Sequence, residues 1–330
     1  MATIKDVAKR AGVAVSTASY ALNNIDKISP DTKRKVIEAA KELNYQKNGI
    51  ASDLKRTKTN TIALILSDLS GPYYSELING VQTVAMTNGY DLIACNSMGD
   101  TQSTAVKFLK EKRVDGVIIL AHNVSDETIL ESAREGFPIV VLDRHLVHDH
   151  VLQVEVDNWQ GGFLATEHLI EKGHRKIGFI SGPSNSHDNS LRFRGYEAAL
   201  EKHGLPYTSK WKISGDFTRE SGYRATKMLI AQNDLPEGIF YANDEMAIGG
   251  LQAFKERGVR VPDDVSIVGF DDIQLAEFVE PPLSTIRQPK YEAGALAVHL
   301  IFQQLSKEKV EPYYKLSTEL IERESVVERD

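Results

Sequence analysis

From Thr61 onwards the chain alternates short apolar runs with longer amphipathic stretches, and this alternation restricts the fold more than any other feature. An apolar run followed by a helix-length stretch predicts a strand buried on both faces, because crossover helices cover both sides of a parallel sheet. We therefore predict an α/β fold with doubly wound parallel sheets. The predicted strands are TIALILSDL, YDLIACNS, VDGVIIL and FPIVVLD in the first half, and RKIGFISG, GIFYAND and VSIVGFDD in the second.

Helices are expected between these strands, and the two halves have the same order of elements. The expected helices are 74–88, 101–112, 125–135, 159–172, 190–203, 218–232 and 245–257. Two similar lobes leave a cleft at the carboxyl ends of their strands, where loops present side chains to a ligand. We assign about 61–160 plus 291–322 to the first lobe and about 161–290 plus 323–330 to the second.

The first 23 residues have a different pattern, which predicts two short helices joined by a tight turn. Thr3 and Asp6 have the spacing of a capping box, and Gly12 can end the first helix with a positive φ. A second helix is expected to start near Val15, with a face of short hydrogen-bonding side chains plus Tyr20 that fits a major groove. This indicates a helix-turn-helix; the alternative is an ordinary helical hairpin whose polar face is only solvated.

A third short helix is predicted next. Ser29 and Pro30 form an N-cap followed by the residue preferred at the first helical position, and Val36, Ala40 and Leu43 mark its inward stripe. We therefore predict a three-helix DNA-binding domain at residues 1–46. The polar, basic stretch 47–60 is expected to be a hinge, and 61–330 the core.

Charge is distributed unevenly along the chain. Residues 1–60 hold 12 Lys or Arg and 6 Asp or Glu, a balance of +6, so the remaining 27 basic and 40 acidic residues give −13. A basic head on an acidic body is typical of a domain that contacts phosphate, joined to one that does not.

Several classes of protein are disfavoured by what the sequence lacks. Cys95 is the single cysteine, so an internal disulfide is impossible; it is expected to be a small buried residue in a reducing compartment. No apolar run is long enough to span a bilayer and no signal peptide precedes the head, so we expect a cytoplasmic protein without a membrane partner. The same absence argues against the alternative of a solute-binding protein for sugar uptake, which would also have no need of a basic head.

An enzyme is a further alternative, and we expect the chain not to be one. It contains no GxxxxGK[ST], GxGxxG, HExxH or GxSxG pattern, and we expect no cofactor. His145, His148 and His150 have a spacing that could hold a metal, but they are more simply explained as a solvated loop after a strand. No catalytic and no metal site is therefore predicted.

Over essentially its full length the chain resembles the lactose-repressor (LacI/GalR) family of bacterial transcription regulators. The matching motifs are TIKDVAKRAGV, NxxAxxL at Asn48–Leu54, YYSELINGV, RVDGVII, YANDEMAIG, VSIVGFDD and PPLSTIRQP. The resemblance implies a core like that of periplasmic sugar-binding proteins, and a homodimer whose paired heads read a pseudo-palindromic operator in double-stranded DNA. It also implies that a small effector in the cleft controls operator affinity. We expect a repressor of carbohydrate-utilisation genes with a sugar or sugar derivative as effector.

The resemblance also assigns the DNA contacts. The base-reading face falls on Val15, Ser16 and Tyr20, and Tyr20 stands where the family usually has arginine, the commonest specific reader of guanine. Ala14 stands where a serine or threonine is common. The expected DNA-contacting residues are Thr3, Ala14, Val15, Ser16, Thr17, Ser19, Tyr20, Asn23, Asn48, Ala51 and Leu54.

In the hinge, the resemblance implies that Leu54 wedges into the central minor-groove step, a few kcal/mol of unstacking being offset by contacts with a bent duplex. Lys47 replaces the usual proline, and Asp53 places a carboxylate near phosphates. Gly49 weakens a hinge helix by about 0.5–1 kcal/mol relative to alanine. Hinge folding is therefore expected to be less favourable than is usual in the family.

In the core, the family's effector contacts match Arg192 and Asp271 most clearly. An arginine and a carboxylate across a cleft can hold vicinal hydroxyls. The expected effector-binding residues are Tyr73, Tyr74, Asn123, Asp143, Arg192, Phe217, Asn243, Asp271 and Gln288. The sequence leaves open the effector's identity, whether it induces or co-represses, whether a dimer or tetramer forms, and whether a protein co-effector takes part.

Overall fold

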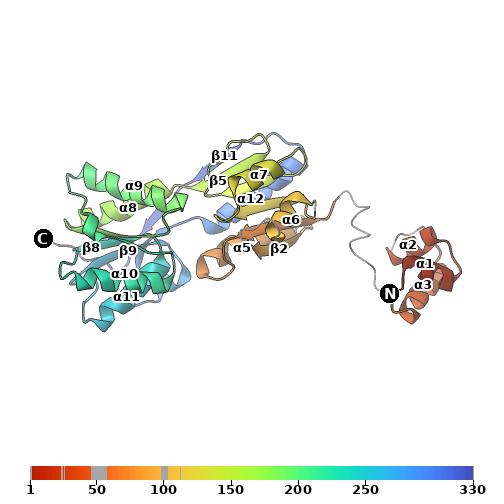
Figure 1. The fold of residues 1–330 in the computed structure, drawn as a ribbon, viewed down its shortest axis with the longest axis horizontal. Helices are drawn as coiled ribbons and strands as arrows, with labels where there is room; N and C mark the ends of the chain where they lie inside the picture. The colour runs from red at the N-terminus through yellow and green to blue at the C-terminus, as the bar shows by residue number, and fades with distance from the viewer. Residues whose placement is uncertain are drawn as a thin grey trace. The chain divides into compact units, whose positions relative to one another are not determined.

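The computed structural model describes residues 2–23, 25, 27–45, 58–97, 103–111 and 113–329. It divides into two compact units, Met1–Thr59 and Asn60–Asp330 (Figure 1). The hinge positions discussed above, Lys47, Asn48, Gly49, Ala51, Asp53 and Leu54, lie outside the described residues. Within the described ranges, no helix combines the length and the apolar content that crossing a membrane requires.

In its described part, the first unit contains α1 (Ile4–Ala11), α2 (Val15–Leu22) and α3 (Pro30–Glu42). The predicted capping box of α1 is confirmed: the Thr3 hydroxyl accepts from the Asp6 amide, and the Asp6 carboxylate accepts from the Thr3 amide at 2.8 Å. Gly12 ends α1 at φ 67°, and the Ser29 hydroxyl caps α3. The local sequence therefore determines where two of these helices start.

A small apolar core holds the three helices together. Val7 of α1, Ala18 of α2 and Val36 of α3 are fully buried in it, and Leu22 and Leu43 pack at its edge. The core residues are spaced at helical intervals, so one stripe of each helix faces inward. The other face of α2 is left for solvent or a ligand.

The first lobe of the second unit has a parallel sheet in which the described strands lie in the order β11-β5-β4-β3-β1-β2. The strands are β1 (Thr61–Leu66), β2 (Asp91–Asn96), β3 (Gly116–Leu120), β4 (Ile139–Leu142), β5 (Val151–Val156) and β11 (Tyr313–Leu316). The helices are α5 (Pro72–Thr87), α6 (Thr104–Lys110), α7 (Asp126–Ser132) and α12 (Lys290–Leu305).

Strand β1 shows why the apolar runs are continuous. Ile62 and Leu64 pack with α5 and α12 on one face, whereas Ala63 and Ile65 pack with α6 and α7 on the other. A strand covered on both sides needs apolar residues at every position. The doubly wound arrangement predicted for this lobe is confirmed.

The second lobe repeats this plan with the order β12-β10-β9-β8-β6-β7, in which β12 alone among the described strands is antiparallel to its neighbour. The strands are β6 (Ile177–Ser181), β7 (Lys212–Ser214), β8 (Gly238–Tyr241), β9 (Ser266–Asp271), β10 (Ser284–Arg287) and β12 (Glu319–Ile321). The helices are α8 (Asn158–Glu171), α9 (His187–Lys202), α10 (Arg219–Ala231) and α11 (Asp244–Glu256), with short 3₁₀ helices at Ser209–Trp211 and Gln274–Glu277. Helices α8 and α9 cover one face of the sheet, and α10 and α11 cover the other (Figure 1).

The structure corrects the sequence prediction in three places. β2 is an edge strand, so Ile93 is exposed rather than buried, and Cys95 is only partly buried. β5, β7, β10, β11, β12 and α12 had not been predicted. β12 pairs with β10, so residues 319–321 belong to the second lobe and not to the first. The residues of β12 lie 32 to 36 positions from their partners in β10, and pairing at this distance leaves no local pattern in a three-residue segment.

Two glycines bring α8 and α9 close together. A Cβ on Gly162 would lie 2.2 Å from the backbone oxygen of Arg192, and a Cβ on Gly195 would lie 2.1 Å from the backbone oxygen of Trp159. Only residues without a Cβ permit this approach. The contact fixes the point at which the Arg192 side chain leaves α9.

Candidate functional site

The predicted base-reading residues lie on the surface of α2. Val15 is 44% exposed and Tyr20 is 37% exposed, and Ser16 is exposed as well. Because Ala18 and Ala21 take the buried side of the same helix, the exposed side carries the residues assigned to base contact. This face has the size and chemistry that a major groove accepts.

The other predicted DNA-contacting residues surround this face. Thr17 and Ser19 are partly buried, and the Asn23 side chain donates to the Ser19 carbonyl at 2.8 Å. Thr3 is the N-cap of α1. Ala14 is the N-cap of α2 and provides no side-chain cap, which agrees with the missing hydroxyl noted in the sequence. The helix dipole and free amides at this end remain available to a phosphate.

A cavity of about 420 Å³ lies between the two lobes of the second unit. The first lobe contributes the loop 67–71, the start of α5, Leu120, His122 and Asp143, and the second contributes residues from five segments. Seven of the nine predicted effector-binding residues line it: Tyr73, Tyr74, Asp143, Arg192, Phe217, Asn243 and Asp271. Folding thus brings together groups that are up to about two hundred residues apart in sequence.

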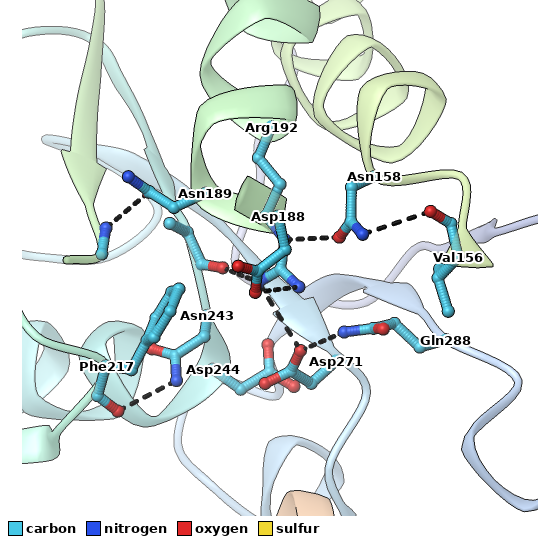
Figure 2. A network of polar contacts seen from close by, with 12 residues as sticks. Val156, Asn158, Asp188, Asn189, Arg192, Phe217, Asn243, Asp244, Asp271 and Gln288 are labelled. Atoms are coloured by element: carbon cyan, nitrogen blue, oxygen red, sulfur yellow. Dashed lines mark hydrogen bonds and ion pairs between the residues drawn. The ribbon is translucent and has the colours of Figure 1, made fainter. Parts of the chain in front are cut away.

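Arg192 is the central cation of the cleft (Figure 2). Its Nε donates to Asn158 Oδ1 at 2.9 Å, and its Nη1 donates to the Ala242 carbonyl at 2.5 Å. Its guanidinium lies 3.6 Å from Asp188 and 3.9 Å from Asp271, and 3.8 Å above the ring centre of Phe270. Five neighbours thus fix a side chain that is only 4% exposed, so its position is set before any ligand arrives.

The pKa values of the two carboxylates beside Arg192 are shifted in opposite directions. Burial opposes ionisation of Asp188, but the charge of Arg192 and the Ser186 hydroxyl hold its pKa below the ordinary value. Burial raises the pKa of Asp271 to about 6, although Arg192 and Lys290 act against this rise. The Asp188 carboxylate therefore neutralises the charge of Arg192, and the Asp271 carboxylate remains able to accept a hydrogen bond from a ligand.

Asp143 faces this pair from the first lobe. Burial raises the pKa of its carboxyl group to about 7, even though Oδ1 accepts from the Val156 amide at 2.8 Å. Burial also raises the pKa of the neighbouring Tyr73 hydroxyl well above its usual range. Near neutral pH the first-lobe side therefore offers the Tyr73 hydroxyl as a donor, and an Asp143 carboxyl group that is present in both its protonated and its ionised form.

Phe217 supplies an aromatic wall and is held in an uncommon backbone conformation. Its φ is 68°, and its carbonyl accepts from the Asn243 side chain at 3.0 Å. Asn243 also caps α11 through the Met246 amide. Asp143 and Asp271 have positive φ as well, at 49° and 115°. Residues with such strained backbone conformations are common in binding sites, where side chains must be held in a fixed direction.

Two predicted residues do not line the cavity. The Asn123 side chain donates to the Ser97 carbonyl at 2.6 Å. Gln288 lies behind Asp271 and donates to its Oδ1 at 2.5 Å (Figure 2), so it orients that carboxylate. Its own Oε1 is buried without a hydrogen-bond partner among the described residues.

Sequence reasoning missed several polar residues of the cleft. Asp188 stands four residues before Arg192 on α9, and this (i, i+4) spacing could have identified it. At the mouth, Arg219 forms a bidentate pair with Glu245 at 3.1 and 3.2 Å. The carboxylates of Asp68 and Asp216 accept from nearby Ser and Thr groups. No sequence pattern pointed to these residues.

The histidine-rich loop shows no metal-binding arrangement in the part of the chain that the structure describes. The rings of His148 and His150 lie 5.7 Å apart, and His145 Nδ1 lies 3.7 Å from Glu155.

Comparisons with known proteins agree with this architecture. Residues 3–48 match the model of bacterial regulatory proteins of the lacI family, and residues 166–326 match the periplasmic binding protein-like domain. The chain is 37% identical over 339 residues to the HTH-type transcriptional repressor PurR of Haemophilus influenzae (strain PittEE), covering 99% of both chains.

Solved structures are similar over the same length. The transcriptional regulator CelR in complex with cellobiose is 32% identical, with a TM-score of 0.74 over 98% of this chain and 100% of that one. The lac repressor dimer bound to operator and the anti-inducer ONPF is 28% identical, with a TM-score of 0.78 over 99% of both chains. With its helix-turn-helix head and its cleft between two lobes, this chain belongs to the lacI family of bacterial regulatory proteins, as a DNA-binding repressor controlled by a small effector.

Proposed function

We propose that this repressor binds a pseudo-palindromic operator as a homodimer and that its effector is an uncharged, polyhydroxylated molecule, a carbohydrate. The observation that carries the proposal is the charge of the cleft. Its described lining has the two arginines Arg192 and Arg219, and six carboxyl groups, those of Asp68, Asp143, Asp188, Asp216, Glu245 and Asp271. Both arginines are already paired with carboxylates.

An anionic ligand would bring another negative charge beside these groups. Like charges within a few ångströms disfavour one another most strongly in a buried site. A sugar hydroxyl, in contrast, can donate to a carboxylate and accept from Arg192 at the same time. The rings of Phe217, Tyr73 and Tyr74 can cover the apolar face of a pyranose or furanose ring.

We expect neutral sugars to bind and anionic sugars not to bind. The test measures heats of binding of cellobiose, ribose, glucose and glucose 6-phosphate to the full-length protein, followed by operator affinity with each ligand at saturation. At least one neutral sugar should bind and change operator affinity, and glucose 6-phosphate should bind at least about tenfold more weakly than glucose, a difference of about 1.4 kcal/mol. Preferential binding of the phosphate would contradict the assignment, as would a response to a neutral nucleobase alone.

For the head, we propose that Tyr20 sets what is unusual about the operator. A tyrosine can donate to a base acceptor or pack on a thymine methyl, whereas arginine selects guanine. Tyr20→Arg should change the preferred base at one position in each half-site, by about 1–3 kcal/mol for a bidentate contact. Selection of operators from random duplexes by both proteins checks this. Ile37→Arg, an equally exposed residue on α3, is the matched control and should leave the selected sequence unchanged. If wild type and Tyr20→Arg select identical operators, Tyr20 does not contact the bases.

The dimer is supported by the lac repressor neighbour, which is a dimer on its operator. Paired heads explain how short recognition helices reach specificity, because two half-sites double the number of base contacts.

A further inference from the structure

Lys290 is a buried cation behind the effector cleft. It is the first residue of α12, and its side chain is only 1% exposed. Its ammonium group donates to the Asp271 carbonyl and, at 3.1 Å, to the Asp272 carbonyl. It also lies 3.5 Å from Glu76 Oε1 on α5. An ammonium group has three protons to donate, and here three acceptors surround it.

These acceptors belong to both lobes. Asp271 is the last residue of β9 in the second lobe and Asp272 follows it, whereas Glu76 and Lys290 itself lie on α5 and α12 in the first. The contact therefore crosses from one lobe to the other just behind the carboxylate that faces the cleft. A buried cation that loses its partners is strongly disfavoured, because no water replaces them. A relative movement of the lobes at this point must keep or replace these contacts.

The backbone that Lys290 holds is strained. Asp271 and Asp272 have φ of 115° and 51°, a region that residues with a side chain rarely adopt. The two side chains leave this segment toward different partners. Asp271 lies against Arg192 and Gln288, and Asp272 is bound by Arg287 at 2.8 Å and Arg323 at 2.7 Å. The carbonyls bound by Lys290 thus help to aim Asp271 into the cleft.

On the first-lobe side, α5 and α12 are packed without room to slide. A Cβ on Gly80 would lie 2.1 Å from the Tyr291 carbonyl oxygen, and a Cβ on Gly294 would lie 2.4 Å from the Leu77 carbonyl oxygen. Glu76 and Lys290 each lie one turn before one of these glycines. The close packing therefore makes α5 and α12 one unit, and Glu76 and Lys290 place one charged side chain from each helix at the same point.

On the basis of the function proposed above, we propose that Lys290 is a positioning residue that couples the effector-facing Asp271 of the second lobe to the α5–α12 pair of the first lobe. Effector binding at the Asp271 carboxylate changes the backbone that Lys290 holds, and the change reaches the first lobe, which leads to the DNA-binding head through the chain. The coupling requires the cation and not the bulk of the side chain. Lys290 contributes to the free-energy difference between the two arrangements of the lobes and does not itself contact the effector.

The test compares full-length wild type with Lys290→Met, which keeps the apolar stem and removes the charge. The probe is whichever of cellobiose, ribose and glucose binds wild type most tightly. Operator affinity is measured without sugar and at saturation, and sugar affinity is measured with and without operator. Couplings of this kind are typically about 5- to 150-fold. The ratio of operator affinities without sugar and at saturation should lie in this range for wild type. For Lys290→Met we expect this ratio to fall below about twofold while sugar binding itself persists.

Reciprocity separates coupling from damage to the fold. The operator must change sugar affinity by the same factor as the sugar changes operator affinity, so both ratios should collapse together in Lys290→Met. Lys315→Met is the matched control, because Lys315 pairs with Asp157 at 2.7 Å near another crossing between the lobes but is 49% exposed. Its ratio should equal that of wild type. Glu76→Gln, which alters the half-exposed partner, should lower the ratio partially and serves if Lys290→Met does not fold.

The outcomes are distinguishable. A wild-type protein whose operator affinity no sugar changes would overturn the proposed function. A responsive wild type with unchanged ratios in both Lys290→Met and Glu76→Gln would overturn the role of Lys290. Equal loss of sugar binding and of sugar-free operator binding in Lys290→Met, with Glu76→Gln unchanged, would also overturn it and leave a purely structural lysine.

Discussion

A chain that begins at Asn60 is expected to lose specific operator binding completely while keeping its effector site. Residues 60–330 form a compact unit with two apolar cores in the first lobe and one in the second, and the cleft is built entirely from this unit. All described residues assigned to base contact lie in the other unit. Specific binding typically exceeds non-specific binding by about a thousandfold or more, and this whole difference should vanish.

Fluorescence anisotropy of a labelled operator checks the first half of this expectation, and calorimetry with the sugar that binds wild type checks the second. The full-length protein should also lose operator affinity steeply as salt is added, because displaced counterions drive phosphate contacts. Operator binding by the truncated chain would refute the division of labour between the units. Loss of sugar binding by a folded truncated chain would show that the cleft depends on the head.

Replacing Arg192 should produce the largest effect of any single substitution in the core. Arg192→Met removes the cation beside Asp188 and Asp271 and leaves the buried Asp188 carboxylate without its arginine, which is expected to lower the free energy of unfolding by about 3–5 kcal/mol. It also removes donors that a sugar hydroxyl would use, each worth about 1.5–3 kcal/mol when charged. Effector affinity should therefore fall at least about a hundredfold.

Urea unfolding and calorimetry measure the two effects separately. Arg219→Met is the matched control, since Arg219 also pairs with a carboxylate of the cleft, Glu245, but is 46% exposed. Its stability should change by less than about 1 kcal/mol. Operator affinity without sugar should stay within a few-fold of wild type in both variants. Wild-type sugar affinity in a folded Arg192→Met protein would place the effector elsewhere.

Local chemistry made much of this protein predictable. The caps at Thr3 and Ser29 and the left-handed Gly12 depend on residues within a few positions of one another, so a sequence pattern records them. The strands β1, β3, β4, β6, β8 and β9 were also visible, because strands covered on both faces need continuous apolar runs. β2 was found but misjudged as buried, since position within a sheet is not a local property.

The cleft was predictable only through the resemblance to a family. Arg192 and Asp271 lie 79 positions apart, and neither carries a local pattern that marks it as a ligand contact. Mouth residues such as Asp68 and Arg219 escaped prediction because segments far apart in sequence bring them together only when the two lobes pack. Gln288 was predicted as a contact, yet the structure places it behind Asp271.

The sequence by itself determined the helix-turn-helix, the basic head and the alternation that leads to two parallel sheets, because each rests on spacing along the chain or on a sum of charges. Only the tertiary structure decided where the lobes exchange segments, which carboxylate balances Arg192, and that Lys290 joins the two lobes behind the cleft. These features depend on groups that are distant in sequence and meet only after close packing. Their energies come from burial and pairing, which no local pattern encodes.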